Sequence, residues 1–265
     1  MNVISNRFYC AVAACLTLLM AGCATVGGSG QAELLTSSDA TESQRRANIR
    51  LQLAVGYYQE RQWNVALDEI KQALAIDPNN AEAYGVRAMI YMEMSETRLA
   101  QDNFMRAMSI APNNPDLSNN YGWFLCQSGQ EAKSIAYFEA AFKNHAYQSP
   151  SKAMNNAGVC SLKMKDNQAA EQYFSQAFRL EPSNPVTNGN MAKLYFGRND
   201  YERARYYIGR ITRVEAMPAD VVWLAIKIER KRGDRAGEAV YAAHLRRLYP
   251  ASVEYSAYQR GAFNE

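Results

Sequence analysis

Histidine and cysteine are the residues of this 265-residue chain with the most obvious potential for chemistry, and both are scarce. The chain contains two histidines, His145 and His244, and five cysteines. No nucleophile or metal-ligand motif of the types G-x-S-x-G, H-E-x-x-H or G-x-x-x-x-G-K accompanies either histidine. We therefore expect both histidines to be surface or capping residues. The sequence predicts no metal site, no cofactor, no small-molecule substrate and no enzymatic activity.

The composition is typical of a globular protein. Lys and Arg number 29 against 26 Asp and Glu, and 48% of the residues are hydrophobic. This mixture is neither collagenous nor disordered. A formal charge of +3 does not indicate the clustered basic face that a nucleic-acid partner requires, so we expect no nucleic-acid binding.

Residues 1–22 have the pattern of a signal peptide. Arg7 precedes an uncharged apolar stretch from Phe8 to Ala21, which is shorter than the about 20 residues of a membrane-spanning helix. The following Met20-Ala21-Gly22-Cys23 resembles the lipobox of bacterial lipoproteins, although the box more often has Leu at the place of Met20. The resemblance implies cleavage before Cys23 and acylation of Cys23, and the alternative is an ordinary signal peptide.

The lipoprotein resemblance also predicts a location. Ala24 follows the acylated cysteine, whereas many inner-membrane lipoproteins have Asp there, so we expect lipid anchoring in the outer membrane, facing the periplasm. Several acyl chains anchor a protein stably where one chain does not. Residues 23–46 contain Gly27, Gly28 and Gly30 among Ser and Thr, and this composition predicts a flexible tether.

A 34-residue period covers the rest of the chain. Asp77-Pro78-Asn79-Asn80 recurs as Ala111-Pro112-Asn113-Asn114 and as Glu181-Pro182-Ser183-Asn184. This spacing resembles the tetratricopeptide repeat, a helix–turn–helix unit. We predict an all-α, right-handed α-solenoid of about six units within residues 47–252, and we expect 253–265 to be a C-terminal cap or tail. The units are 47–80, 81–114, 115–148, 151–184, 185–218 and 219–252.

Small residues mark the places where the two helices of a unit are expected to cross. Gly or Ala there lets helices approach closely, and an aromatic or aliphatic residue of the second helix packs nearby. The small residues predicted at the crossing are Ala54, Ala88, Gly122, Gly158, Ala192 and Ala225.

The first helix of each unit is expected to line a concave groove with its second, fifth, sixth, ninth and twelfth residues. The early units offer apolar side chains there, and units three to five offer asparagines. Asn side chains either bind an extended peptide backbone or bond to neighbouring helices, and both interpretations stay open. The predicted partner-binding residues are Leu51, Val55, Tyr58, Gly85, Met89, Met92, Asn119, Asn120, Asn155, Asn156 and Asn190.

Cys10 and Cys15 lie in the signal segment and Cys23 lies in the lipobox, which leaves two other cysteines. Cys126 and Cys160 are 34 residues apart, on the first helices of adjacent units. An even pair in an oxidising compartment predicts a disulfide. The alternative is two buried thiols that act as small apolar residues.

The segments Asn119-Asn120-Tyr121-Gly122-Trp123-Phe124-Leu125-Cys126 and Asn155-Asn156-Ala157-Gly158-Val159-Cys160 carry a narrower resemblance. Together with six repeats behind a lipobox, they resemble the PilF/PilW family of type IV pilus biogenesis lipoproteins. The resemblance implies a pilotin, which escorts the secretin subunit to the outer membrane and promotes its multimerisation for pilus assembly and twitching motility. It also implies secretin binding at the apolar groove of the first unit.

Two other roles fit the same class of scaffold. One is stabilisation of assembled pili, and the other is assistance to a different outer-membrane or cell-wall assembly. The doubled Asn and the two Cys favour the pilotin, and we expect a monomer.

Overall fold

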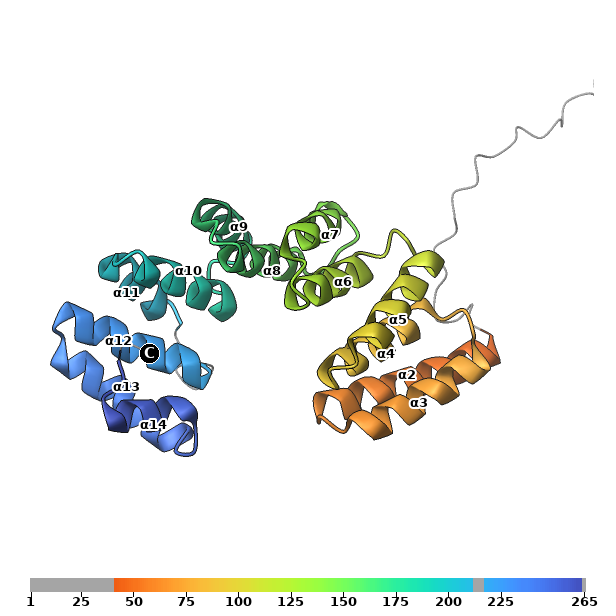
Figure 1. Cartoon of the computed structure of the whole chain (residues 1–265), viewed down its shortest axis with the longest axis horizontal. Helices are drawn as coiled ribbons and strands as arrows, with labels where there is room; N and C mark the ends of the chain where they lie inside the picture. The colour runs from red at the N-terminus through yellow and green to blue at the C-terminus, as the bar shows by residue number, and fades with distance from the viewer. Residues whose placement is uncertain (1–40, 212–216, 264–265) are drawn as a thin grey trace, which may run out of the picture. The chain divides into compact units, whose positions relative to one another are not determined.

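The computed structural model describes residues 41–211 and 217–263, and this part of the chain contains helices and no strands (Figure 1). The predicted all-α fold is confirmed. The helices are α2 (Glu42–Gln59), α3 (Trp63–Ile76), α4 (Ala81–Glu93), α5 (Thr97–Ile110), α6 (Pro115–Gln127), α7 (Glu131–Lys143), α8 (Pro150–Lys163), α9 (Asn167–Leu180), α10 (Pro185–Gly197), α11 (Tyr201–Gly209), α12 (Ala219–Arg232), α13 (Arg235–Leu248) and α14 (Val253–Arg260).

Successive helices form pairs that stack in chain order (Figure 1). The contacts are extensive within the pairs α4 with α5, α6 with α7, α8 with α9, α10 with α11, and α12 with α13, and α7 also has extensive contacts with α8 of the next pair. The first helix of each pair also contacts the first helix of the next, from α4 to α6 and onward to α12. Each pair therefore buries one face inside itself and another against its neighbour, as repeat proteins require.

Asparagine side chains begin several of the first helices. The Asn80 side chain accepts a hydrogen bond from the Ala83 backbone N–H at 2.9 Å, and Asn114 accepts one from Leu117 N–H at 3.0 Å. These bonds satisfy backbone donors that a helix leaves unpaired in its first turn. Pro115 starts α6 directly after its cap, where a missing N–H costs nothing. The recurrent Pro-Asn-Asn segments thus act as the boundaries between units.

Small residues lie at the helix crossings, as predicted. Ala54, Ala88, Ala192 and Ala225 are buried, and so is Gly158. A Cβ built on Gly158 would overlap the ring of Phe174, so only glycine allows α8 and α9 to approach this closely.

The last pair departs from the pattern. Its α13 carries Glu238 at the place where the other second helices have a small residue, and Glu238 accepts a 2.9 Å bond from Arg230. The buried Glu229 of α12 pairs with Arg205 of α11 and with Arg232. Charge pairs therefore replace part of the apolar contact between the last two pairs.

Residues 253–263 form a cap on the last pair. Helix α14 contacts both α12 and α13. After it, the Phe263 ring lies 5.2 Å from the Trp223 ring, and the Arg230 guanidinium lies 3.8 Å from the Phe263 centroid. Aromatic and cation–π contacts of this kind favour a fixed C-terminal segment.

The predicted signal peptide, Cys10, Cys15, the lipidation residue Cys23 and the tether up to residue 40 lie outside the described residues, as do 212–216 and 264–265. The prediction that the tether extends to residue 46 is wrong, because α2 begins at Glu42. Within the described ranges, every helix is too short or too polar to cross a membrane.

Candidate partner-binding site

Residues at the same position of different units are buried to a similar extent. The predicted groove residues therefore divide into those at buried positions and those at partly or fully exposed positions. The second residue of each unit is exposed, and the sixth and ninth are mostly intermediate. The fifth residue is buried in every unit. These fifth residues are Leu51, Gly85, Asn119, Asn155, Gly189 and Trp223.

The prediction that Leu51 faces the groove is therefore wrong. Ala47, Leu51 and Ala54 are the buried residues of α2, and their spacing of four and three residues follows the 3.6-residue helical period. Leu51 is only 4% exposed and belongs to the apolar core that includes Ile70 of α3. It holds the first pair together and is not presented to a partner.

The prediction that Gly85 faces the groove is also wrong, for a different reason. It is buried in α4, and a Cβ built on it would lie 2.5 Å from Leu117 Cδ2 of α6. The missing side chain lets Leu117 fill the space between consecutive first helices. Gly85 therefore shapes the contact between units two and three.

Four of the predicted apolar residues do reach the surface, and we name them the N-terminal apolar surface: Val55, Tyr58, Met89 and Met92. All four are partly buried and pack on the cores of the first two pairs. The Tyr58 hydroxyl donates a 3.4 Å hydrogen bond to Glu93, which brings the ends of α2 and α4 side by side. Two methionines beside an aromatic ring form an adaptable surface for an apolar partner segment.

Tyr58 stays protonated under physiological conditions. Burial, followed by the neighbouring Glu93 carboxylate, raises the pKa of Tyr58 to about 12. Its ring also lies 5.3 Å from that of Trp63. Tyr58 therefore offers a partner a fixed aromatic face with a neutral hydroxyl.

The asparagines form a hydrogen-bonded ladder between units. The Asn156 side-chain amide donates to Asn119 at 2.9 Å, and the Asn190 amide donates to Asn155 at 3.1 Å. In both pairs the sixth residue of one unit donates to the fifth residue of the preceding unit. Asn120 accepts a 3.2 Å bond from Asn119 within the same unit.

For Asn119 and Asn155, the ladder decides between the two interpretations left open by the sequence. Asn119 and Asn155 are 1% and 4% exposed, and Asn155 also donates to Ser151 O and to the Thr187 hydroxyl. Their amides are occupied in holding neighbouring helices, so they are not surface groups for a partner. The sixth-position residues Asn120, Asn156 and Asn190 are only partly buried.

A disulfide joins units three and four. Cys126 and Cys160 are bonded, with their Cα atoms 5.9 Å apart, as the spacing predicts. Lys163 of α8 donates a 3.1 Å bond to the Cys126 carbonyl oxygen beside it. The bridge and the ladder therefore reinforce the same contact between α6 and α8.

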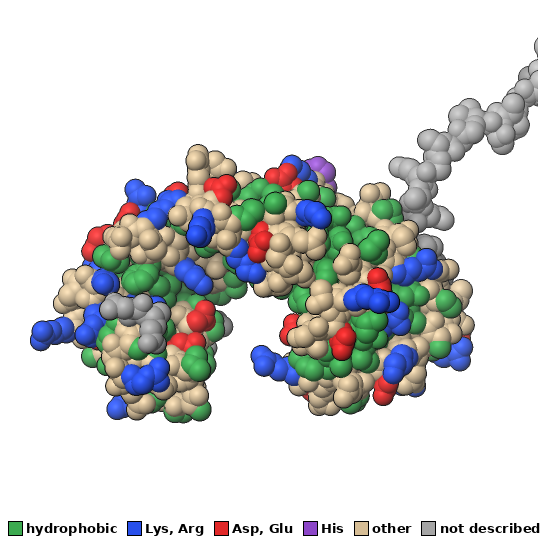
Figure 2. Space-filling view, viewed as in Figure 1, with side chains coloured by type: hydrophobic (Ala, Val, Ile, Leu, Met, Phe, Trp, Pro, Cys, Tyr) green, Lys and Arg blue, Asp and Glu red, His purple; other side chains and the backbone are tan. Residues whose placement is uncertain are grey.

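The histidines do not form a site. His145 is exposed, and His244 is partly buried in α13, where its Nδ1 lies 3.4 Å from an Arg247 nitrogen. The part of the chain that the structure describes holds no cluster of three metal-ligating side chains. Figure 2 shows Lys and Arg interspersed with Asp, Glu and apolar side chains on the visible face.

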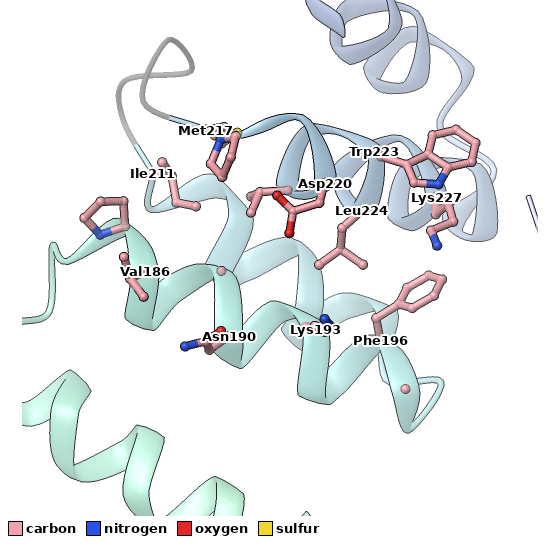
Figure 3. Close-up of a pocket in the computed structure, with 15 residues that line it drawn as sticks. Val186, Asn190, Lys193, Phe196, Ile211, Met217, Asp220, Trp223, Leu224 and Lys227 are labelled. Atoms are coloured by element: carbon pink, nitrogen blue, oxygen red, sulfur yellow. The ribbon is translucent and has the colours of Figure 1, made fainter. Parts of the chain in front are cut away.

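A groove between α10 and α12 was not predicted. It encloses about 620 Å³ and combines apolar side chains with lysines (Figure 3). Nine of the 15 lining residues, Asn190 among them, occupy positions of units five and six that the pattern assigns to the groove. From α10 these are Val186, Gly189, Asn190, Lys193 and Phe196, and from α12 they are Asp220, Trp223, Leu224 and Lys227.

Comparison with known proteins gives the same repeat and a specific relative. Models of the tetratricopeptide repeat match residues 81–114, 125–185 and 161–221. The chain is 31% identical to the type IV pilus assembly protein PilF of Pseudomonas aeruginosa over 252 residues, which are 94% of this chain and 98% of that relative.

Two solved structures are similar along the whole of their own chains. The crystal structure of PilW, a type IV pilus biogenesis factor, has a TM-score of 0.72 and 33% identity over 83% of this chain and 100% of that one. A structure of Pseudomonas aeruginosa PilF has a TM-score of 0.70 and 28% identity, with the same coverage.

Proposed function

Because the chain belongs to the PilF/PilW family of tetratricopeptide-repeat proteins in type IV pilus biogenesis, we propose that it is a pilotin, which binds the secretin subunit and promotes its assembly in the outer membrane. The observation that carries this proposal is the match to PilF over 94% of the chain. A scaffold role in pilus biogenesis follows from the family. The secretin partner and the membrane location are the further steps of the proposal.

The N-terminal apolar surface is the proposed secretin-binding site. Tyr58 and Met92 are partly exposed on adjacent first helices, and the Tyr58–Glu93 hydrogen bond fixes their spacing. An apolar patch of this kind, next to polar side chains, is typical of a protein-interaction site. The surface has no arrangement for bond chemistry, so the proposed action is binding alone.

The lipobox residue Cys23 supplies the proposed anchor. Acyl chains on Cys23 would restrict the protein to the target membrane, and a tether would raise the effective concentration of the bound secretin there. We therefore propose that the repeats face the periplasm. Recognition and delivery would then be separate properties of the repeats and of the N-terminus.

An immunoblot for heat- and SDS-resistant secretin multimers in outer membranes tests the proposal. The strains carry the native gene, a deletion, Cys23→Ala, and Tyr58→Asp, with Met105→Asp as the matched control because Met105 is exposed on α5 outside the surface. We expect the deletion and Tyr58→Asp to lose multimers, Cys23→Ala to mislocalise them, and Met105→Asp to resemble the native strain.

Normal multimers in all strains would overturn the pilotin role. If the fibres were nevertheless unstable in the deletion strain, the result would favour stabilisation of assembled pili by this scaffold. Loss of multimers in Met105→Asp as well would show that the effect of Tyr58→Asp is not specific to the N-terminal apolar surface.

A further inference from the structure

The groove between α10 and α12 is open because Gly189 has more space beside it than the equivalent Gly85. Gly85 and Gly189 occupy the fifth position of units two and five. A Cβ on Gly85 would lie 2.5 Å from Leu117, whereas a Cβ on Gly189 would lie 3.6 Å from its nearest neighbour, Val221. Leu117 and Val221 are the third residues of the following units, so the shorter valine leaves space that leucine fills in the earlier contact.

Apolar side chains line much of this groove. Leu224 of α12 lies over Lys193 of α10, and Val186 lies farther along the groove, toward Ile211 (Figure 3). Val186 is 60% exposed although it borders the cavity. A volume of about 620 Å³ is within the range of sites that hold ligands, about 300–1,000 Å³, so the groove accommodates a large aliphatic side chain.

The charged side chains lie unevenly along the groove. Lys193 and Lys227 occupy the ninth positions of units five and six, and the Lys227 Nζ lies 5.5 Å from the Trp223 ring. Burial, and then the charge of Lys193, lower the pKa of Lys227. Asp220 lies near the start of α12, between Met217 and Leu224 (Figure 3). A carboxylate at the lysine end would be attracted by both cations, and one beside Asp220 would be repelled.

The distance from the apolar space to the lysine sets the spacing of the groups that the groove fits. Gly189 and Lys193 are four residues apart on α10, which is about 6 Å along a helix axis. An extended chain advances about 3.3 Å per residue, so about two residues reach from the space beside Gly189 to Lys193.

We infer that the α10/α12 groove binds an extended segment of a partner protein in which an aliphatic side chain lies about two residues from a carboxylate. The aliphatic side chain occupies the space beside Gly189 and Leu224. The carboxylate lies at Lys193, close to the charge of Lys227. This site is separate from the N-terminal apolar surface, and its occupation depends neither on the lipid anchor nor on the identity of the secretin.

Fluorescence anisotropy with labelled peptides tests the inference on the full chain purified in detergent. The probes carry Leu-Ser-Asp or Asp-Ser-Leu in a Gly/Ser background, because the groove does not set the chain direction. We expect saturable binding of at least one probe. Replacing its Asp by Asn or its Leu by Ser should weaken binding by about tenfold, as expected for losing a charge-assisted or an apolar anchor.

Protein variants locate the binding. Lys193→Glu should weaken binding of the carboxylate probe by about tenfold or more and leave the weak binding of the Asn probe unchanged. Gly189→Leu should abolish binding by filling the cavity. Lys152→Glu is the matched control, because Lys152 is an exposed lysine on the first helix of another unit, and circular dichroism checks that each variant is folded.

Three outcomes would overturn the inference. The first is the absence of saturable binding of either probe. The second is equal binding by Lys193→Glu and the native protein, since the lysine end would then not hold the carboxylate. The third is a dimer in sedimentation that Gly189→Leu dissociates, which would assign the groove to a second copy of the chain.

Discussion

The Asn156 side-chain amide donates a 2.9 Å hydrogen bond to the side-chain oxygen of Asn119, one repeat earlier in the chain. The same bond recurs one unit later between Asn190 and Asn155. Because the acceptors are almost fully buried, these amides act primarily as connections between units. The ladder therefore belongs to the rigid part of the scaffold, and its last member, Asn190, borders the α10/α12 groove.

Asn155→Ala should destabilise the fold more than an ordinary surface change. It removes the partner of Asn190 and of the buried Thr187 hydroxyl, and unpaired buried polar groups cost about 1–3 kcal/mol. Chemical denaturation measures the free energy of unfolding. Gln172→Ala, an exposed change on α9 of the same pair, should stay within about 0.5 kcal/mol of the native protein. Equal effects of the two substitutions would contradict the structural role of the ladder.

Leu51→Asp and Val55→Asp should differ although the residues are one turn apart. Leu51 lies in the core of the first pair, so a carboxylate there should cost about 3 kcal/mol or more. Val55 is partly exposed at the edge of the same core, and its variant should unfold at a temperature closer to that of the native protein. The melting temperatures of the two variants test this order, and the reverse order would restore Leu51 to the groove.

The helices of this fold could be predicted from local signals. The Pro-Asn-Asn boundaries and the small residues such as Gly158 recur with the repeat, and each acts within one pair of helices. The inward face was harder to predict, since whether Leu51 or Gly85 is buried depends on the packing of neighbouring helices. The α10/α12 groove depends on the difference in size between Leu117 and Val221. This difference opens a space only when the first helices are stacked, so the sequence alone does not reveal it.

Loss of the disulfide should lower stability without changing the fold. A bridge between Cys126 and Cys160 closes a 34-residue separation, for which the chain-entropy model gives about 4 kcal/mol. The double variant Cys126→Ala/Cys160→Ala should therefore unfold at a lower denaturant concentration. Its circular dichroism spectrum should remain that of the native protein, because each cysteine is buried as a small apolar side chain.

Reductant provides the control for this comparison. It should shift the unfolding midpoint of the native protein towards that of the double variant and leave the variant unchanged. A native protein that is insensitive to reductant, together with two titratable thiols after denaturation, would contradict the presence of the bridge.

Gly158→Ala should destabilise the chain, although alanine is the better helix former. A methyl group at this position would meet the Phe174 ring, and overpacking of a core costs about 1–3 kcal/mol. Gly56→Ala is the matched control, because Gly56 lies in the last turn of α2 and a Cβ on it meets nothing within 4 Å. It should stabilise the protein by about 0.5–1 kcal/mol. Opposite shifts of the melting temperature are expected, and a stabilised Gly158→Ala would show that α8 and α9 are not in close contact there.

Glu171 should make part of the stability dependent on pH. Hydrogen bonds from Tyr195 and then from Arg198 hold the pKa of this carboxyl below its ordinary value of 4.5. A carboxyl with a lowered pKa in the folded state stabilises the protein above its unfolded pKa, and this contribution is lost as the pH falls through the folded pKa. The native protein should therefore melt above Glu171→Gln at pH 7, and the difference should shrink as the pH falls from about 5 towards 3.

Thermal denaturation across this range measures the difference at each pH. Glu96→Gln, at an exposed glutamate before α5, controls for the loss of one negative charge. A difference between native protein and Glu171→Gln that stays constant from pH 7 to pH 3 would show that the carboxylate form of Glu171 is not what Tyr195 and Arg198 stabilise. The contact between α9 and α10 would then depend on the shape of this side chain and not on its charge.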